Sequence, residues 1–417
     1  MDRAKPTILI FTTHTGGGHR NLAQALRETL GTRYEVVILD PQSPLVGPMY
    51  TAASRHFVHF LHWQFALTDN PFVSFCVQRF LALKSSRRFR DLIERIQPDL
   101  VIATHAMLSY TTARALERVA GQRIARPPAR GGPTIHDGPT SSTDARSIVG
   151  PPLAGGLGLG TRRIPLVFQL TDLGRLNATW FAEKRADAYL VPTQEILAQA
   201  LEQGIEQERL HLTGRPIRQQ FLTLSPDVRE ETLRSLDFDP AVFTLFLQGG
   251  AMGAAGLERT ITGVLATGTP VQIILACGDN NGLAARYAGR EHVRVLPFTA
   301  QIAPYMASAD VIVGKAGASF ISEAFILGKP FLVTSFIPGQ ETPNLRFIEQ
   351  HNLGWVCPRP AEQIALLRQL ASDPGLLAEK AASIHAYRTW NIQANQRILP
   401  AIDRLLAAPI CYPVGAD

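Results

Sequence analysis

The sequence predicts an α/β protein with two successive domains, each built around a parallel sheet. Its 417 residues suffice for two domains of ordinary size. Short apolar runs typical of buried strands alternate with helical patterns in both halves of the chain. Each half also has a glycine-containing loop between a strand pattern and a helix pattern. We therefore expect two Rossmann-like domains facing a cleft, with ligands at the carboxyl ends of the strands.

The first domain begins with a strand, a loop, a helix and a second strand. Thr7–Phe11 is an apolar run, and the apolar spacing of Asn21–Leu30 predicts a helix. Tyr34–Leu39 is a second apolar run. Further buried strands are predicted at 98–103, 164–168 and 188–191.

A stretch from Gly121 to Arg163 separates two of these strands. It is rich in Pro, Gly, Ser and Arg and has almost no aromatic residues. Such a composition buries too little apolar surface to hold one conformation, so we predict a mobile insertion.

The second α/β series starts near Ala241, after a polar segment around 214–240 that we interpret as a linker. We expect an N-terminal domain at 1–215, a C-terminal domain at 216–395, and a final segment, 396–417, that returns to the first domain. The predicted strands are Val242–Leu247, Pro270–Ala276, Val293–Leu296, Ala309–Val313 and Pro330–Val333, with a helix at Phe320–Leu327.

The composition indicates a globular protein without membrane-spanning segments or paired cysteines. Hydrophobic residues make up 46% of the chain, enough for packed cores. No apolar stretch is long enough to span a bilayer, and the N-terminus lacks a signal-peptide pattern, so we expect a cytoplasmic location. The four cysteines stand far apart, which predicts neither a zinc site nor a disulfide framework.

The positive charge is concentrated in the first half of the chain. Residues 1–215 hold 25 Lys and Arg against 18 Asp and Glu, whereas the remainder holds 16 against 17. This asymmetry predicts that the first half meets an anionic surface. The sequence has no recognisable nucleic-acid module, which favours acidic lipid over nucleic acid.

The first glycine loop is Thr15-Gly16-Gly17-Gly18-His19. It departs from the dinucleotide fingerprint, whose third glycine would fall on Asn21, and it lacks the Gly-Lys-Ser/Thr of a P-loop. A helix N-terminus favours a neutral histidine, which suits a general base. A capping or structural histidine is the alternative interpretation of His19.

The second loop, 314–319, precedes a predicted helix whose free N–H groups suit a diphosphate. Ser319 could cap this helix or donate to a phosphate, and Glu323 could accept ribose hydroxyls. The polar loop 337–344 offers amide and carboxylate groups for sugar hydroxyls. The alternatives are a solvated helical carboxylate for Glu323 and an ordinary surface turn for 337–344.

In this order, the motifs resemble those of the diacylglycerol glycosyltransferases, which comprise monogalactosyldiacylglycerol synthases and processive diacylglycerol glucosyltransferases. They are more distantly similar to those of the peptidoglycan N-acetylglucosaminyltransferase that acts on lipid I. The segments that carry the resemblance are 15–20, 171–173, 179–181, 214–218, 276–278, 315–317, 321–324 and 337–344.

The resemblance implies a GT-B fold and a metal-independent, inverting transfer that needs no cofactor besides the UDP-sugar donor. It implies that His19 is the general base and that Glu323 binds the uridine ribose. It further implies a donor site of Gly250, Phe298, Gly317, Ala318, Ser319, Gln340, Glu341 and Asn344, and an acceptor side of Gly17, Gly18, Asp172 and Trp180.

Two features bear on the acceptor. The family usually has His-Pro before Thr-Trp-Phe, where this chain has Asn177-Ala178. The region from Met49 to Arg95 is rich in aromatic residues and ends in basic ones, which suits the surface of an anionic membrane. The alternative is that these aromatic residues belong to the core and the arginines to a solvated face.

The sequence therefore predicts a peripheral membrane enzyme on the cytoplasmic face that moves a hexose from UDP-glucose or UDP-galactose to a diacylglycerol-type lipid. Three alternatives remain open: transfer to a polyprenyl-linked acceptor, a UDP-sugar epimerase, and a nucleotide-binding regulatory protein.

Overall fold

The computed structural model describes residues 5–13, 17–42, 63, 65–125, 163–249, 257–278 and 280–407. Gly250, residues 126–162 of the predicted insertion and residues 49–62 and 64 of the predicted membrane region lie outside these ranges.

The first domain contains a six-stranded parallel sheet with the order β2-β1-β3-β4-β5-β6. Every internal strand is buried, as expected for a parallel sheet covered on both faces. The strands are β1 (Thr7–Phe11), β2 (Glu35–Leu39), β3 (Leu100–Ala103), β4 (Leu166–Gln169), β5 (Ala188–Val191) and β6 (Leu210–Leu212).

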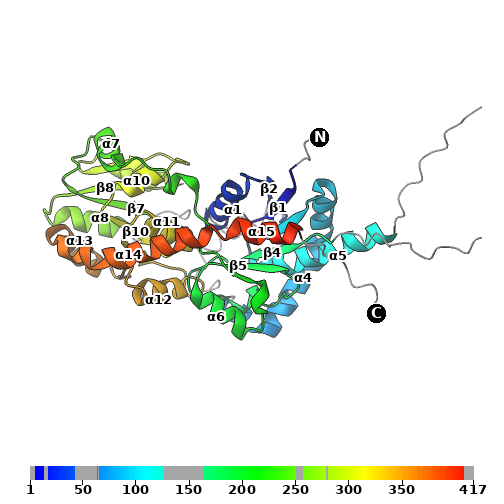
Figure 1. Ribbon diagram of the computed structural model, residues 1–417. Coiled ribbons are helices and arrows are strands. Elements are labelled where there is room, and N and C mark those ends of the chain that lie inside the picture. The colour runs from blue at the N-terminus through cyan, green and yellow to red at the C-terminus, as the bar shows by residue number, and fades with distance from the viewer. Residues whose placement is uncertain are drawn as a thin grey trace, which may run out of the picture.

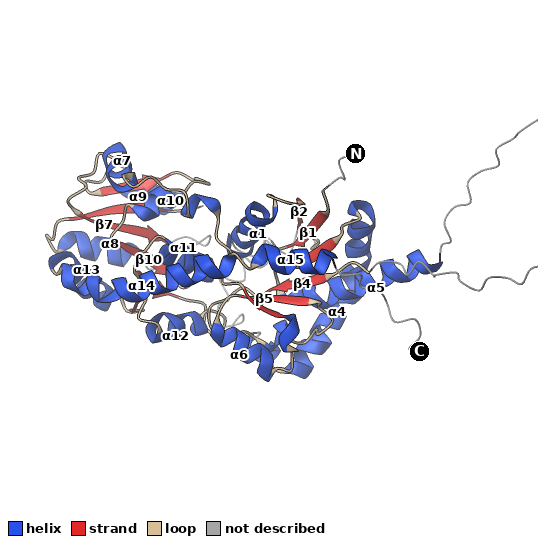
Figure 2. Ribbon diagram, viewed as in Figure 1, coloured by secondary structure: helices blue, strands red, loops and turns tan. Residues whose placement is uncertain are grey.

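Alternate residues of these strands supply two cores. Ile8 and Ile10 face α1 (Gly17–Leu30) and α15 (Ile398–Ala407), whereas Leu9 and Phe11 face the opposite layer. That layer consists of α4 (Pro71–Ile96), α5 (Ser109–Ala125) and α6 (Gln194–Glu202). Figure 2 shows the strands of the first domain flanked by these helices.

The second domain repeats the design with the strand order β12-β11-β10-β7-β8-β9, again all parallel. Its strands are β7 (Phe243–Gln248), β8 (Val271–Ala276), β9 (Val293–Leu296), β10 (Val311–Lys315), β11 (Phe331–Ser335) and β12 (Gly354–Val356). Its helices are α7 (Val228–Ser235), α8 (Leu257–Ala266), α9 (Asn281–Tyr287), α10 (Ala303–Ala307), α11 (Ala318–Ile326), α12 (Thr342–Gln350), α13 (Pro360–Ser372) and α14 (Pro374–Asn395).

The chain crosses between the domains twice, at 213–218 and where α14 passes into α15 (Figure 1). The two crossings are hydrogen-bonded to each other. The side chain of Asn391 pairs with the backbone N–H and carbonyl of Arg215 at 2.7 and 3.0 Å, and Asn395 donates to the carbonyls of Thr213 and Arg215. The residues after the second crossing then pack on β1 and α1, so α15 completes the core of the first domain.

The structure extends several predicted elements. Helix α1 begins at Gly17, and α5 continues to Ala125, into the first residues of the predicted insertion. Because the residue before a proline disfavours the α conformation, Pro127 explains why α5 ends there. The linker prediction for 214–240 was too broad, since this segment contains α7, whose Leu233 is buried in the second core. Strands β6 and β12 were missed because each has only three residues.

Ile402→Ala should lower the free energy of unfolding by about 2–5 kcal/mol, because the side chain is fully buried between α15 and the first sheet. Urea denaturation followed by circular dichroism measures the loss. The control is Arg404→Ala in the same helix, which removes an exposed side chain and should change stability by less than about 0.5 kcal/mol. Equal effects of the two variants would contradict a structural role for α15.

Candidate active site

His19 lies in the first turn of α1, directly beyond the carboxyl end of β1. Its Nδ1 is 2.9 Å from the carbonyl oxygen of Thr104, which follows β3. A carbonyl only accepts hydrogen bonds, so this contact assigns the ring proton to Nδ1 and leaves the Nε2 lone pair available. An imidazole held in this way has the form required of a general base.

Burial keeps the His19 ring neutral. Its pKa is lowered from 6.5 to about 4: loss of hydration is the largest cause, the bond to Thr104 opposes it, and the positive charge of Arg215 adds to the lowering. At neutral pH, His19 is therefore an unprotonated base.

A second histidine, His105, contacts the first and was not predicted. The two rings lie edge to face with their centroids 4.6 Å apart. The Nδ1 of His105 accepts a hydrogen bond from the backbone N–H of Met107 at 3.2 Å, and burial holds its pKa well below 6.5. The sequence signal was its place after the buried strand 98–103, at the edge where ligands of parallel sheets bind.

The second glycine loop faces His19 from the other domain. Gly317 is the N-cap of α11, and Ala318 and Ser319 form its first turn, so the backbone N–H groups of this turn are free of intrahelical partners. The hydroxyl of Ser319 donates to the carbonyl of Gly18 at 3.0 Å, and it accepts from the guanidinium of Arg215 at 2.6 Å. The structure thus brings the two predicted loops together.

Glu323 lies one turn further along α11 and is largely enclosed. Its carboxylate is 2.8 Å from the guanidinium of Arg218, which comes from the first crossing of the chain. Burial raises the pKa of Glu323, whereas Arg218 and Arg215 oppose that shift. Asn21 and Leu22 of α1 line a small pocket opposite Glu323, together with Arg215, Pro216, Ile217, Ser319, Ser322 and Ile326.

Asn344 joins the domains on the other side of the cleft. Its amide oxygen accepts from the N–H of Leu173 at 3.1 Å, and its amide nitrogen donates to the carbonyl of Ala316 at 3.1 Å and to Asp172 at 3.4 Å. Burial raises the pKa of Asp172, and Arg215 is the largest opposing influence. Asn344, predicted for the donor site, and Asp172, predicted for the acceptor side, therefore lie together, and the Asn344 amide is already bonded within the protein.

The remaining donor-side residues are spread along the carboxyl edge of the second sheet. The buried carboxylate of Glu341 pairs with Lys315 and accepts from the N–H of Ile337 at 2.8 Å. Gln340 precedes it in the same loop. Phe298 follows β9 and is 88% exposed, so its ring is open to a stacking partner.

The prediction that Trp180 contacts the acceptor needs correction. Trp180 lies in a short 3₁₀ helix, Ala178–Trp180, and is 5% exposed within the core below α4 and α5. Neighbouring Asn177 takes a structural role: its side chain caps this helix and donates to the carbonyl of Phe65 at 2.9 Å.

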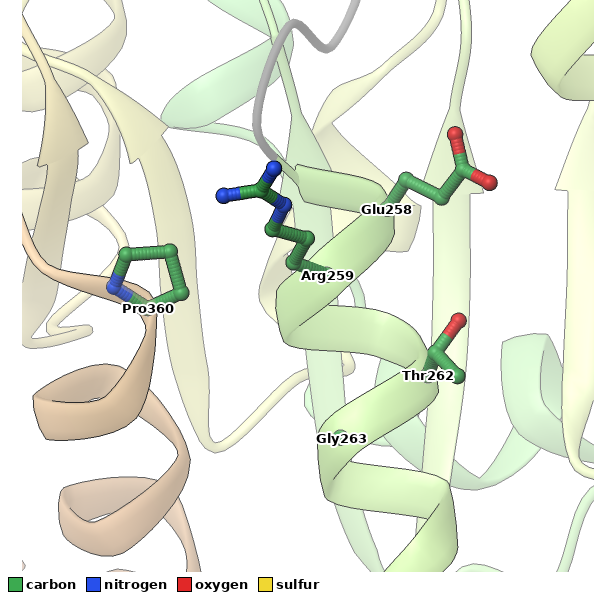
Figure 3. A pocket seen from close by; sticks show the side chains of 5 residues that line it. All are labelled: Glu258, Arg259, Thr262, Gly263 and Pro360. Atoms are coloured by element: carbon green, nitrogen blue, oxygen red, sulfur yellow. The ribbon is translucent and has the colours of Figure 1, made fainter.

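A second pocket lies in the C-terminal domain between α8 and the start of α13 (Figure 3). Arg259 points from α8 toward Pro360, whereas Glu258 and Thr262 project from the other side of the helix. Glu258 is paired with Arg286. None of the residues predicted to act on a donor or acceptor lines this pocket, so the interdomain cleft is the candidate active site.

The described residues offer neither a metal-binding cluster nor a membrane-spanning helix. No group of three or more His, Cys, Asp or Glu side chains there is arranged to hold a metal ion. No helix in the same residues combines the length and hydropathy needed to cross a membrane.

Comparisons with known proteins agree with the motifs. The family model of the glycosyltransferase family 28 C-terminal domain matches residues 244–369, and that of monogalactosyldiacylglycerol (MGDG) synthase matches residues 160–217. A probable monogalactosyldiacylglycerol synthase 2, chloroplastic, from Oryza sativa subsp. indica is 26% identical over 379 residues, which cover 86% of this chain and 72% of the relative.

Solved structures share the architecture at low identity. MurG of Acinetobacter baumannii aligns with a TM-score of 0.55 and 14% identity, covering 96% of this chain and 99% of that chain. A putative UDP-N-acetylglucosamine 2-epimerase from Listeria monocytogenes aligns with a TM-score of 0.57 and 12% identity, covering 97% of each chain. These likenesses and the two facing parallel sheets confirm the GT-B fold.

The family matches, the relatives and the fold confirm the predicted resemblance: the chain has a GT-B fold, matches the family 28 C-terminal domain over residues 244–369, and is similar to MGDG synthases over most of its length.

Proposed function

We propose that the protein transfers a hexose, with inversion and without a metal, from a UDP-sugar to diacylglycerol or a related membrane lipid. The observation that carries this proposal is the placement of His19. Its unprotonated Nε2 belongs to the first domain, and the free N–H groups of α11 face it from the second domain. The similarity to MGDG synthases supports a lipid acceptor.

In the proposed donor complex, the diphosphate binds at the first turn of α11, at Gly317, Ala318 and Ser319. A helix N-terminus carries about half a positive charge and presents unbonded N–H groups to an anion. Phe298 would stack on the uracil, and Glu323 would accept the ribose hydroxyls, exchanging part of its contact with Arg218. Gln340 and Glu341 would meet the sugar, with UDP-glucose and UDP-galactose as the donors to test.

The reaction needs one base and a stabilised leaving group. His19 Nε2 takes the proton of the acceptor hydroxyl, whose oxygen then attacks the anomeric carbon of the sugar. The bond from that carbon to the diphosphate oxygen breaks, and its electron pair leaves with UDP. Attack from the face opposite the leaving group inverts the anomeric configuration. The amides and dipole of α11 stabilise the charge that develops on the diphosphate.

Helix α4 supplies the proposed membrane contact. Four large apolar side chains, which we call the α4 stripe, are exposed on one face: Phe72 (74%), Phe75 (40%), Phe80 (57%) and Leu83 (72%). Arg79 stacks on Phe75 within this face, and Arg87 and Arg88 are exposed at its end. An apolar stripe flanked by arginines fits the surface of an anionic bilayer, where we place the enzyme on the cytoplasmic side.

The central test incubates the purified protein with radiolabelled UDP-sugars and diacylglycerol vesicles and separates the lipid products. We expect labelled glycolipid from UDP-glucose or UDP-galactose. His19→Ala should lower transfer by about 10²–10⁴-fold, the usual contribution of a general base, while UDP still binds. Wild-type rates in that variant would exclude His19 as the base. Conversion of UDP-N-acetylglucosamine without an acceptor would instead support an epimerase, and labelling only of a polyprenyl-linked acceptor would replace the proposed lipid.

The pH profile tests the state of His19. The base works only when neutral, and its pKa is about 4, so kcat/KM should stay level as pH falls from 8 to 5 and decline only near pH 4. Circular dichroism at each pH checks that the fold persists. A decline centred on pH 6.5 would contradict the enclosed position of the ring.

Replacing three residues of the α4 stripe together, Phe72→Ser, Phe80→Ser and Leu83→Ser, should weaken binding to vesicles with anionic lipid at least about tenfold, because each residue removes apolar area from the interface. Vesicle sedimentation measures the partition. Leu201→Ser with Leu222→Ser is the control, since these side chains are 42% and 43% exposed and lie outside the stripe. Equal losses in the two variants would argue against α4 as the contact.

A further inference from the structure

Hydrogen bonds hold the backbone of Arg215 in place at the first crossing between the domains. Asn391 bonds both its backbone N–H and its carbonyl, and Asn395 bonds the carbonyl again at 2.9 Å. The preceding Gly214 has a φ of +68°, which a residue with a side chain rarely adopts. A side chain at 214 would also collide with Asn391. This bend and these bonds fix the direction in which Arg215 leaves the backbone.

Arg215 is 3% exposed, and its guanidinium lies at the first turn of α11. One of its terminal nitrogens donates to Ser319, a neutral hydroxyl. The other, Nη1, is buried and has no hydrogen-bond partner among the described residues. No carboxylate among the described residues forms an ion pair with Arg215. Glu323 is paired with Arg218, and Asp172 acts on Arg215 only at longer range.

An enclosed cation without an anionic partner is unfavourable, because burial removes its hydration and nothing replaces it. Two other enclosed charges of the cleft have ion-pair partners, Glu323 with Arg218 and Glu341 with Lys315. Among the described residues, Asp172 has none and acts on Arg215 only at longer range. The guanidinium of Arg215 borders the pocket between α1 and α11, beside a helix N-terminus that also attracts anions. The buried guanidinium of Arg215 and the N-terminus of α11 therefore both favour an anion at the same place.

We propose that Arg215 binds the diphosphate of the nucleotide-sugar donor and, with the N-terminus of α11, neutralises it as it leaves. This assignment rests on the proposed function and adds to it a cation that comes from the interdomain crossing. A guanidinium suits the task because its planar set of donors can contact two phosphate oxygens at once. A bound donor would then contact the first crossing between the domains, α11 and the first turn of α1 at once.

The test compares wild-type protein with Arg215→Met by isothermal titration with UDP and with uridine, which lacks the phosphates. We expect the affinity for UDP to fall by about 10–100-fold, the equivalent of a lost charged hydrogen bond, and the affinity for uridine to stay unchanged. Arg215→Lys should recover part of the loss, since it restores the charge without the planar donors. Without ligand, Arg215→Met should melt no lower than wild type, because it removes an uncompensated charge.

Arg397→Met is the matched control. This arginine is exposed at the second crossing, so its loss removes the same charge from the same region and should leave UDP affinity unchanged. Equal UDP affinity in wild type and Arg215→Met would overturn the role of Arg215 alone. Loss of UDP and uridine binding together with a lower melting temperature would also overturn it, in favour of a structural arginine. Failure of the wild-type protein to bind UDP would overturn both this role and the UDP-sugar donor.

Discussion

The arrangement of the cleft depends on the hydroxyl of Ser319. It donates to Gly18 at the start of α1 and accepts from Arg215 at the crossing, so one oxygen joins both domains and the segment between them. This contact brings the N-termini of α1 and α11 together, each at the carboxyl edge of its own sheet. Both termini carry partial positive charge, and their approach makes the space between them favourable to an anion.

Hydrogen bonds to enclosed polar groups hold this arrangement on both sides. Asn344 ties the loop after β4 to the loop after β10, and Asn391 ties the two crossings. His351 and Glu195 add an outer contact between α12 and α6 at 2.5 Å. The bonds of Asn344 to Leu173, of Asn391 to Arg215 and of His351 to Glu195 each connect residues more than 100 positions apart, so a few side chains determine how the two domains are placed. Gly174 is part of the same constraint, since a side chain there would collide with the backbone of Pro343.

Much of the architecture was predictable because its signals are local. The apolar run at Thr7–Phe11 coincides with β1, since a strand buried on both faces needs such a run, and the run at Val293–Leu296 coincides with the edge strand β9. The meeting of the His19 and Ser319 loops followed from a rule about parallel sheets together with the resemblance of the motifs. In contrast, Arg215 falls within the motif segment 214–218, and the sequence alone assigns it no role. Its enclosure against Ser319, 104 positions away, depends on tertiary structure that no local pattern encodes.

Trp180 illustrates the opposite error. The motif around it is shared with the family, but a large aromatic residue near a cleft can serve the core as readily as the ligand. Here Trp180 packs in the core below α4 and α5, and Asn177 caps the short helix that contains it. A motif identifies where a segment lies more reliably than it identifies which of its side chains face the substrate.

The charge of Arg215 also links the proposed base, His19, to the proposed site of the leaving diphosphate. The groups that act on the His19 ring are the carbonyl of Thr104, the imidazole of His105 and, at longer range, Arg215. Arg215 lowers the pKa of His19, so any anion that pairs with Arg215 weakens that effect and makes the imidazole more basic. His105 carries no charge that could oppose the change, since burial keeps it neutral. A base tuned in this way is weakest in the empty cleft and gains proton affinity when negative charge enters beside α11.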